Sequence, residues 1–116
     1  MKLYGIAHCS TVKQCRAWLA DRGREAPFHD YAKQGVDPQR LRNWAAQVGW
    51  EIRLNRKGTT WRKLSEAEQA RVTTADAALR LMQQKPSLIE RPVLETGQGI
   101  VVGFDPETYS RLFAQM

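Results

Sequence analysis

The stretch of sequence that decides the fold is Lys2-Leu3-Tyr4-Gly5-Ile6-Ala7-His8-Cys9-Ser10-Thr11-Val12-Lys13-Gln14-Cys15. It opens with an apolar run, residues 3–7, that is typical of a β-strand and stops at His8-Cys9. Thr11 and Gln14 have the spacing of a capping box, so we expect Thr11 to be the N-cap of a helix. Cys9 would then lie two residues before that helix, in a loop facing its unpaired backbone N–H groups.

Cys9 is the candidate reactive residue. Unpaired N–H groups and the helix dipole favour an anion, and therefore favour a thiolate over a thiol. A thiolate is both a nucleophile and a redox centre. A cysteine near a helix start is also often a small, half-buried packing residue. Position alone therefore leaves both interpretations of Cys9 open.

The composition is that of one globular domain. With 116 residues, 42% hydrophobic and 26% charged, the chain can form a real core and has no disorder signature. No apolar run approaches the roughly 20 residues of a membrane helix. Tyr4, Gly5 and His8 interrupt what would be the apolar core of a signal peptide. We therefore expect a cytoplasmic protein with reduced cysteines.

The formal charge of +6 permits nucleic-acid binding without demonstrating it. The densest basic cluster, which is interleaved with Trp61, consists of Arg53, Arg56, Lys57, Arg62 and Lys63. Such a cluster could bind phosphates, a small anionic substrate or the carboxylates of a thiol cofactor. No recognised nucleic-acid motif accompanies it, so nucleic acid is not the partner we predict.

The first part of the chain predicts a β-α-β unit with parallel strands. Its helix runs from Thr11 to about Arg22, and its second strand covers residues 26–31. Cys15 falls on the apolar face of the helix and is predicted to be a core residue. Six residues of helix rise roughly 9 Å, beyond the 7 Å or so between Cα atoms that a disulfide tolerates. A Cys9–Cys15 bridge is therefore not expected. A zinc site is not expected either, because no CxxC or HxxxH pair is present.

The middle of the chain predicts a helical block at about residues 38–85, inserted into a single domain of residues 1–116. Asp37 and Pro38 start one helix, Ser65 starts a short one, and residues 74–84 form another. Residues 50–60 have no strong period, and residues 56–64 are expected to be a loop that leads into a short helix. Two strands follow, from Val93 and over 100–104, joined by the turn Gly97-Gln98-Gly99. Asp105 and Pro106 open a last helix.

This order of elements, with a cysteine at the first strand-to-helix turn, resembles the thioredoxin fold. The fold class that it implies is α/β, with a mixed four-stranded sheet flanked by helices and a helical insertion between the second and third strands. In that fold a cis-proline precedes the third strand and faces the active cysteine. Pro92 would fill this place, and a cis X-Pro bond is seldom accidental.

The details resemble the arsenate reductase (ArsC/Spx/YffB) family. The segments that are similar are Tyr4-Gly5-Ile6 with His8-Cys9-Ser10-Thr11, Asn55-Arg56-Lys57-Gly58-Thr59-Thr60-Trp61-Arg62-Lys63-Leu64, and Ile89-Glu90-Arg91-Pro92. The likeness covers nearly the whole chain and is greatest to the YffB group, proposed glutathione-dependent thiol reductases.

The resemblance implies roles for particular residues. Cys9 matches the family's nucleophile, and Arg56 and Arg91 match arginines that bind the anionic substrate. Guanidinium groups lower a thiol pKa and offer paired donors to an oxyanion or to a carboxylate of glutathione. Thr11 and Lys13 are expected to assist at the helix start, and Pro92 to shape the groove.

The chemistry that follows is that of a small cytoplasmic thiol reductase with glutathione as resolving thiol and co-substrate, because no second cysteine is well placed. A small oxyanion or a disulfide is the expected substrate, and glutaredoxin a candidate partner. No metal or tightly bound cofactor is expected, and the short edge strands suggest a monomer.

Two departures from the family pattern bear on the alternatives. Arsenate reductases carry a third arginine where this chain has Asp105, whose charge would repel an oxyanion. The Spx branch, regulators that bind RNA polymerase, usually carries a CxxC pair, and position 12 here is Val. A true arsenate reductase and a non-catalytic regulator remain as alternative interpretations.

Overall fold

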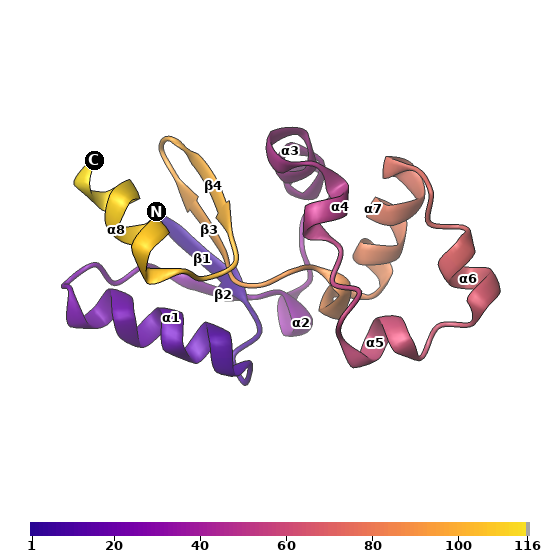
Figure 1. Ribbon diagram of the computed structural model, residues 1–116, viewed down its shortest axis with the longest axis horizontal. Helices are drawn as coiled ribbons and strands as arrows, with labels where there is room; N and C mark the ends of the chain where they lie inside the picture. The colour runs from indigo at the N-terminus through magenta and orange to yellow at the C-terminus, as the bar shows by residue number, and fades with distance from the viewer. Residues whose placement is uncertain (116) are drawn as a thin grey trace. The chain divides into compact units, whose positions relative to one another are not determined.

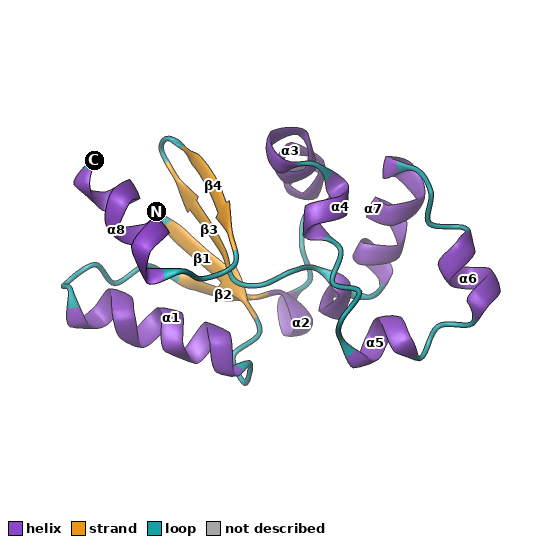
Figure 2. Cartoon of the chain, in the orientation of Figure 1, coloured by secondary structure: helices purple, strands orange, loops and turns teal. Residues whose placement is uncertain are grey.

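Figure 1 shows the computed structural model of the chain, in which residues 1–115 are described. The chain divides into two compact units, one made of residues 1–29 with residues 91 onward and the other of residues 30–90. We call them the sheet unit and the helical unit. The sheet belongs to the first, with the last residue of β2 at the boundary, and helices make up most of the second (Figure 2).

The elements follow one another in the order expected for a β-α-β unit, a helical block and a β-β-α unit. They are β1 (Lys2–Gly5), α1 (Ser10–Asp21), β2 (Phe28–Asp30), α2 (Tyr31–Gln34), α3 (Pro38–Val48), α4 (Trp50–Arg53), α5 (Thr59–Arg62), α6 (Glu66–Ala70), α7 (Ala75–Gln84), the 3-10 helix η1 (Pro86–Leu88), β3 (Val93–Thr96), β4 (Gly99–Val102) and α8 (Pro106–Ala114). Among residues 1–115, no helix is both long and apolar enough to cross a membrane.

The sheet has four strands in the order β2-β1-β3-β4. Strand β3 pairs antiparallel with β1, Leu3 opposite Leu94, and with β4, Val93 opposite Val102. Strand β2 follows β1 through helix α1, the kind of connection that makes neighbouring strands parallel. The sheet is therefore mixed, and the predicted thioredoxin-like α/β fold class is confirmed.

Helices α1 and α8 share one hydrophobic core on the sheet. Successive strand residues point to opposite faces, so Leu3 and Leu94 meet on the face that the two helices cover. Helix residues three or four positions apart then supply the other side of the core. The buried members of this cluster are Leu3, Cys15, Leu19, Leu94, Tyr109 and Phe113.

Cys15 links the two helices that cover the sheet. Its thiol is fully buried and donates a hydrogen bond to the hydroxyl of Tyr109, at 3.5 Å. The Tyr109 hydroxyl in turn donates to the carbonyl of Gly103, at 3.3 Å. Burial raises the pKa of the Cys15 thiol, which keeps it protonated. The prediction that Cys15 is a core residue is confirmed.

Gly5, at the end of β1, sets how closely the strand approaches α1. A Cβ atom at this position would lie 2.8 Å from Cγ2 of Val12, inside van der Waals contact. Glycine therefore permits the first turn of α1 to pack directly on the end of the strand. In the sequence Cys9 lies between Gly5 and Val12, in the turn that joins β1 to α1.

Most of the predicted helix starts in the helical unit are confirmed, because side-chain caps mark them. Asp37 accepts from the N–H of Arg40, with Pro38 at the first helical position, and Ser65 forms a capping box with Glu68. The Thr74 side chain caps α7 by accepting from the N–H of Ala77.

Some segments of the helical unit and of β2 differ from expectation. Residues 50–60 show no strong period in the sequence, but they begin with α4, whose four residues are too short to show one. The loop predicted over residues 56–64 does lead into a short helix, α5. The second strand was expected over residues 26–31, but it ends at Asp30. The Asp30 side chain accepts from the N–H groups of Ala32 and Lys33 and starts α2 at Tyr31.

Arg53 is buried in the helical unit, and no acidic side chain of residues 1–115 pairs with it. Its side chain is 0% exposed, and its guanidinium carbon lies 4.4 Å from the ring centroid of Trp44. Its three side-chain nitrogens have no hydrogen-bond partner among residues 1–115. Burial lowers the Arg53 pKa to about 10, against the opposing effect of nearby Tyr31, so the group is still charged at neutral pH.

Replacing Arg53 by methionine is therefore expected to raise the free energy of unfolding. A buried donor left without a partner costs about 1–3 kcal/mol, more if it is charged, and methionine keeps an unbranched, flexible side chain while removing that cost. Urea unfolding of Arg53→Met, with exposed Arg62→Met as the matched control, measures the change. A lower stability of Arg53→Met than of Arg62→Met would show that the guanidinium has a partner in solution.

Candidate active site

Cys9 lies at the N-cap of α1. Its N–H donates to the carbonyl of Ile6, at 3.1 Å, which closes a short turn after β1. Its own carbonyl accepts from the N–H of Lys13, at 2.9 Å, which is the first bond of the helix. The prediction that Thr11 is the N-cap was wrong. The turn brings the chain into helical conformation at Ser10, so Thr11 already lies in the first helical turn.

This position exposes the Cys9 sulfur to the positive end of the helix. Burial of the half-exposed side chain raises the thiol pKa, but the other influences lower it, and together they outweigh burial. They are the backbone N–H groups of Val12 and Thr11 and the guanidinium of Arg91. Although the sulfur accepts no capping hydrogen bond of standard geometry, these donors favour the thiolate. The pKa of Cys9 therefore lies below its ordinary value.

Arg91 reaches Cys9 because of the pairing between β1 and β3. Tyr4 lies opposite Val93 in this antiparallel ladder, so the residues before Val93 run alongside the residues that follow β1. The guanidinium of Arg91 is thereby brought close enough to the Cys9 sulfur to lower its pKa. The structure thus brings together two residues that are 82 positions apart (91 − 9).

Pro92 follows Arg91 through a cis peptide bond, as the resemblance implied. Its carbonyl accepts from the N–H of Gly103, at 2.8 Å, and its side chain is buried. Gly103 has a φ of 84°, a conformation that glycine adopts without strain. The segment that presents Arg91 is therefore tied to the end of β4.

The remaining predicted site residues are placed as follows. Thr11 is half-buried and contributes its backbone N–H, and Lys13 is exposed one turn along α1. Arg56 belongs to the helical unit, where its side chain is exposed and its guanidinium lies over the rings of Trp50 and Trp61. The two tryptophans were not predicted as site residues, although Trp61 was recognised within the basic cluster.

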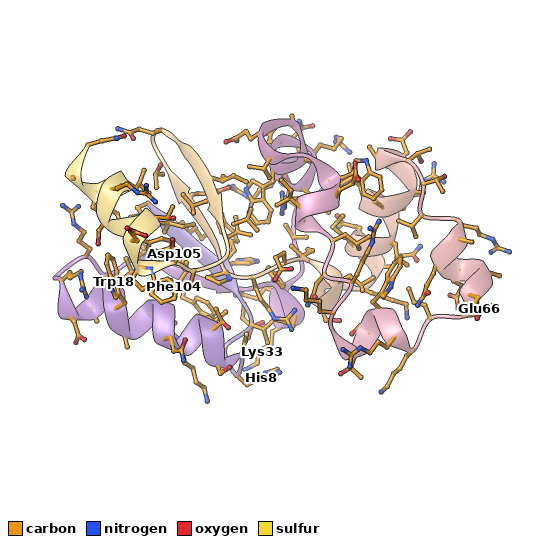
Figure 3. The ribbon with its side chains drawn as sticks, viewed as in Figure 1. His8, Trp18, Lys33, Glu66, Phe104 and Asp105 are labelled. Carbon is orange, nitrogen blue, oxygen red and sulfur yellow. The ribbon has the colours of Figure 1, made fainter. Side chains whose placement is uncertain are left out.

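Asp105, at the position where the resemblance implied an arginine in arsenate reductases, has a structural role. It is the N-cap of α8, and its carboxylate accepts from the hydroxyl and the N–H of Thr108, at 2.6 and 3.3 Å. These bonds hold its pKa below the ordinary value. Asp105 lies beside Phe104 and Trp18, apart from His8 in the loop before α1 (Figure 3).

No group of three or more histidine, cysteine or acidic side chains within residues 1–115 could hold a metal ion. His8 is exposed next to Cys9, and His29 packs its ring against Tyr4, at 5.2 Å between centroids. The chemistry available at Cys9 is therefore that of a half-exposed thiolate beside a guanidinium and a helix N-terminus. Such a group can attack a sulfur centre or an oxyanion.

Comparison with known proteins agrees with this geometry. The model of the ArsC family matches residues 4–112. The chain belongs to the ArsC family. The predicted family resemblance is thereby confirmed, and both Cys9 and the Arg91-Pro92 segment lie inside the matched region.

Several relatives of this ArsC-family protein cover nearly its whole length. An uncharacterised protein of Haemophilus influenzae is 36% identical over 97% of both chains. A solved structure named as a YffB protein is 47% identical, covers 94% of this chain and 95% of its own, and superposes with a TM-score of 0.88. An arsenate reductase (ArsC) related protein from Brucella melitensis is 44% identical, covers 97% and 95%, and gives a TM-score of 0.75.

The geometry of this ArsC-family site predicts that Cys9 reacts as a thiolate below the pH at which an ordinary cysteine does. The rate of alkylation by iodoacetamide should rise to half its maximum at a pH below about 8.5, the pKa of an unperturbed cysteine. Replacing Arg91 by methionine removes the cation and the donor beside the sulfur, so the midpoint should move to higher pH.

The control for this measurement is Arg111→Met, which removes an exposed cation from α8 in the same unit. Its midpoint should stay at that of the unmodified protein. An unperturbed midpoint in the unmodified protein, or equal midpoints in the Arg91→Met and Arg111→Met variants, would contradict the electrostatic description of Cys9.

Proposed function

We propose that this protein is a thiol reductase in which Cys9 is the nucleophile and glutathione is the resolving thiol. The observation that supports the proposal is the combination of a half-exposed Cys9, whose pKa is lowered by Arg91 and the start of α1, with a fully buried Cys15. Cys9 is accessible and favoured as a thiolate, whereas Cys15 lies in the hydrophobic core. The adduct on Cys9 then needs a thiol from outside the chain.

The reaction takes place in two exchange steps. The Cys9 thiolate attacks the glutathione sulfur of a glutathionylated protein, the S–S bond breaks, and the protein leaves as a thiolate that takes up a proton. A second glutathione, as its thiolate, then attacks the glutathione sulfur bound to Cys9. This step forms oxidised glutathione and returns the Cys9 thiolate, so glutathione is oxidised as the protein disulfide is reduced.

The residues around Cys9 have distinct proposed roles. Arg91 and the N–H groups of Val12 and Thr11 stabilise Cys9 as attacking and leaving thiolate. Pro92 shapes the surface beside the sulfur, and Lys13 adds positive charge along α1. Arg56 binds a carboxylate of the thiol partner, for which a guanidinium offers paired donors.

Reduction of a disulfide is favoured over reduction of arsenate by the charge at position 105. An arsenate site needs cations to bind a tetrahedral oxyanion, and Asp105 supplies an anion that is already engaged as the cap of α8. The reducing compartment implied by glutathione is the cytoplasm. Glutaredoxin is a proposed second acceptor of the adduct, and we propose a monomer.

The proposal predicts a glutathione adduct on Cys9 alone. Intact mass spectrometry after incubation with oxidised glutathione should show one adduct in the unmodified protein and in Cys15→Ala, and none in Cys9→Ser. Reduction of a glutathionylated peptide, coupled to glutathione reductase and NADPH, should be lost in Cys9→Ser and retained in Cys15→Ala.

Three results would count against the proposal. Full turnover by Cys9→Ser would exclude Cys9 as the nucleophile. Turnover of arsenate but not of the glutathionylated peptide, in the presence of glutathione and glutaredoxin, would establish an arsenate reductase instead. A cellular role that survives Cys9→Ala, together with retention of a protein partner in a pull-down, would indicate a non-catalytic regulator.

A further inference from the structure

Arg56 differs from the other exposed cations of its segment. Its guanidinium carbon lies 6.0 Å from the ring centroid of Trp50 and 5.6 Å from that of Trp61, within the range of cation–π attraction. Lys57 and Arg62 are also exposed, but within residues 1–115 neither contacts an aromatic ring. Two rings therefore act on one cation of the cluster.

The backbone that carries Arg56 is fixed on both sides. Before it, the N–H of Asn55 donates to the carbonyl of Leu88, at 2.7 Å. After it, the N–H of Lys57 donates to the Asn55 side-chain oxygen, at 3.1 Å. A Cβ atom at Gly58 would lie 3.0 Å from the Asn55 side-chain nitrogen, so glycine leaves room for this turn. The Arg56 backbone is held without any ligand.

The backbones that carry the two rings are also held by hydrogen bonds. Trp50 opens α4, and its carbonyl accepts from the N–H of Leu54, at 3.2 Å. Trp61 lies in α5, and its carbonyl accepts from the side chain of Gln69, at 2.9 Å. Both side chains are half-buried. The two rings therefore extend from hydrogen-bonded backbone and keep an accessible surface over which the guanidinium lies.

We propose that Trp50 and Trp61 are positioning residues that hold the Arg56 guanidinium ready for a carboxylate of the thiol partner. The inference rests on the proposed function, which assigns a carboxylate of glutathione to Arg56. A free arginine loses much rotamer freedom when it binds a ligand, and a pre-oriented one loses less. A guanidinium that lies over ring faces keeps its edge N–H groups for a planar, bidentate acceptor, which is the geometry of a carboxylate.

The test measures binding without turnover. Cys9→Ser protein is titrated with S-methylglutathione, which has both carboxylates but no free thiol, and the dissociation constant is followed by NMR. Trp50→Leu and Trp61→Leu should each weaken binding about 2- to 5-fold, and the double variant about 5- to 30-fold. Trp50→Phe and Trp61→Phe keep a ring and should restore most of the affinity. Inorganic sulfate, which is not planar, should respond less to the same changes.

A second measurement separates positioning from a general structural effect. In protein with Cys9 intact, the leucine variants should raise KM for glutathione while kcat and the pH midpoint of Cys9 alkylation stay unchanged. Lys57→Ala, which removes a neighbouring charge without a ring contact, is the matched control and should change KM less than Arg56→Ala does.

The outcomes distinguish this inference from the function on which it rests. If Arg56→Ala leaves the affinity for S-methylglutathione unchanged, Arg56 does not bind the carboxylate and both fail. If Arg56→Ala weakens binding but the leucine variants do not, the proposed function stands and the positioning role is overturned. A phenylalanine variant that binds as poorly as its leucine counterpart also overturns it.

Discussion

The antiparallel pairing of β1 with β3 is the constraint on which the candidate site depends. The two strands come from opposite ends of the chain, and the pairing of Tyr4 with Val93 decides which side chains meet beyond their ends. A shift of this register by one residue would turn Leu3 and Leu94 away from the helices that cover them. The hydrophobic core therefore specifies the register, and the register delivers Arg91 to Cys9. In this way apolar packing in the sheet unit determines the electrostatics of a thiol that is not part of the core.

The two cysteines show how environment assigns different chemistry to the same side chain. Both lie on the same helix, and burial raises the pKa of both thiols. At Cys9 the helix N-terminus and a guanidinium reverse the sign of the total shift. At Cys15 the hydroxyl of Tyr109, which is itself buried, is the one polar neighbour among residues 1–115 that acts on the pKa, and the thiol stays neutral. Six residues along one helix thus separate a nucleophile from a packing residue.

Features that depend on local sequence could be predicted, and features that depend on tertiary contacts could not. Asp37, Ser65 and Asp105 mark helix starts because a short polar side chain caps the N–H groups next to it. The start of α1 was placed wrongly, because the bond from Cys9 to Ile6 begins the turn without any capping side chain. Cys9 could be proposed from its place between a strand and a helix, whereas Arg91 and Pro92 were found through the family resemblance, since no period or spacing relates them to Cys9. Nothing in the sequence distinguishes Arg53, which is buried against Trp44, from Arg56, which lies exposed over two rings.

The burial of Cys15 also has a consequence under oxidative stress. If peroxide converts the Cys9 thiolate to a sulfenic acid, the chain has no second accessible thiol with which to close a disulfide. The sulfenic acid then either condenses with a thiol from solution or is oxidised further to the sulfinic acid, which is not reversed by thiols. These two second-order reactions compete for the sulfenic acid. The ratio of free thiol to peroxide in the cell therefore decides whether Cys9 is recovered or lost. The same core that buries Cys15 leaves Cys9 dependent on the surrounding thiol pool for repair.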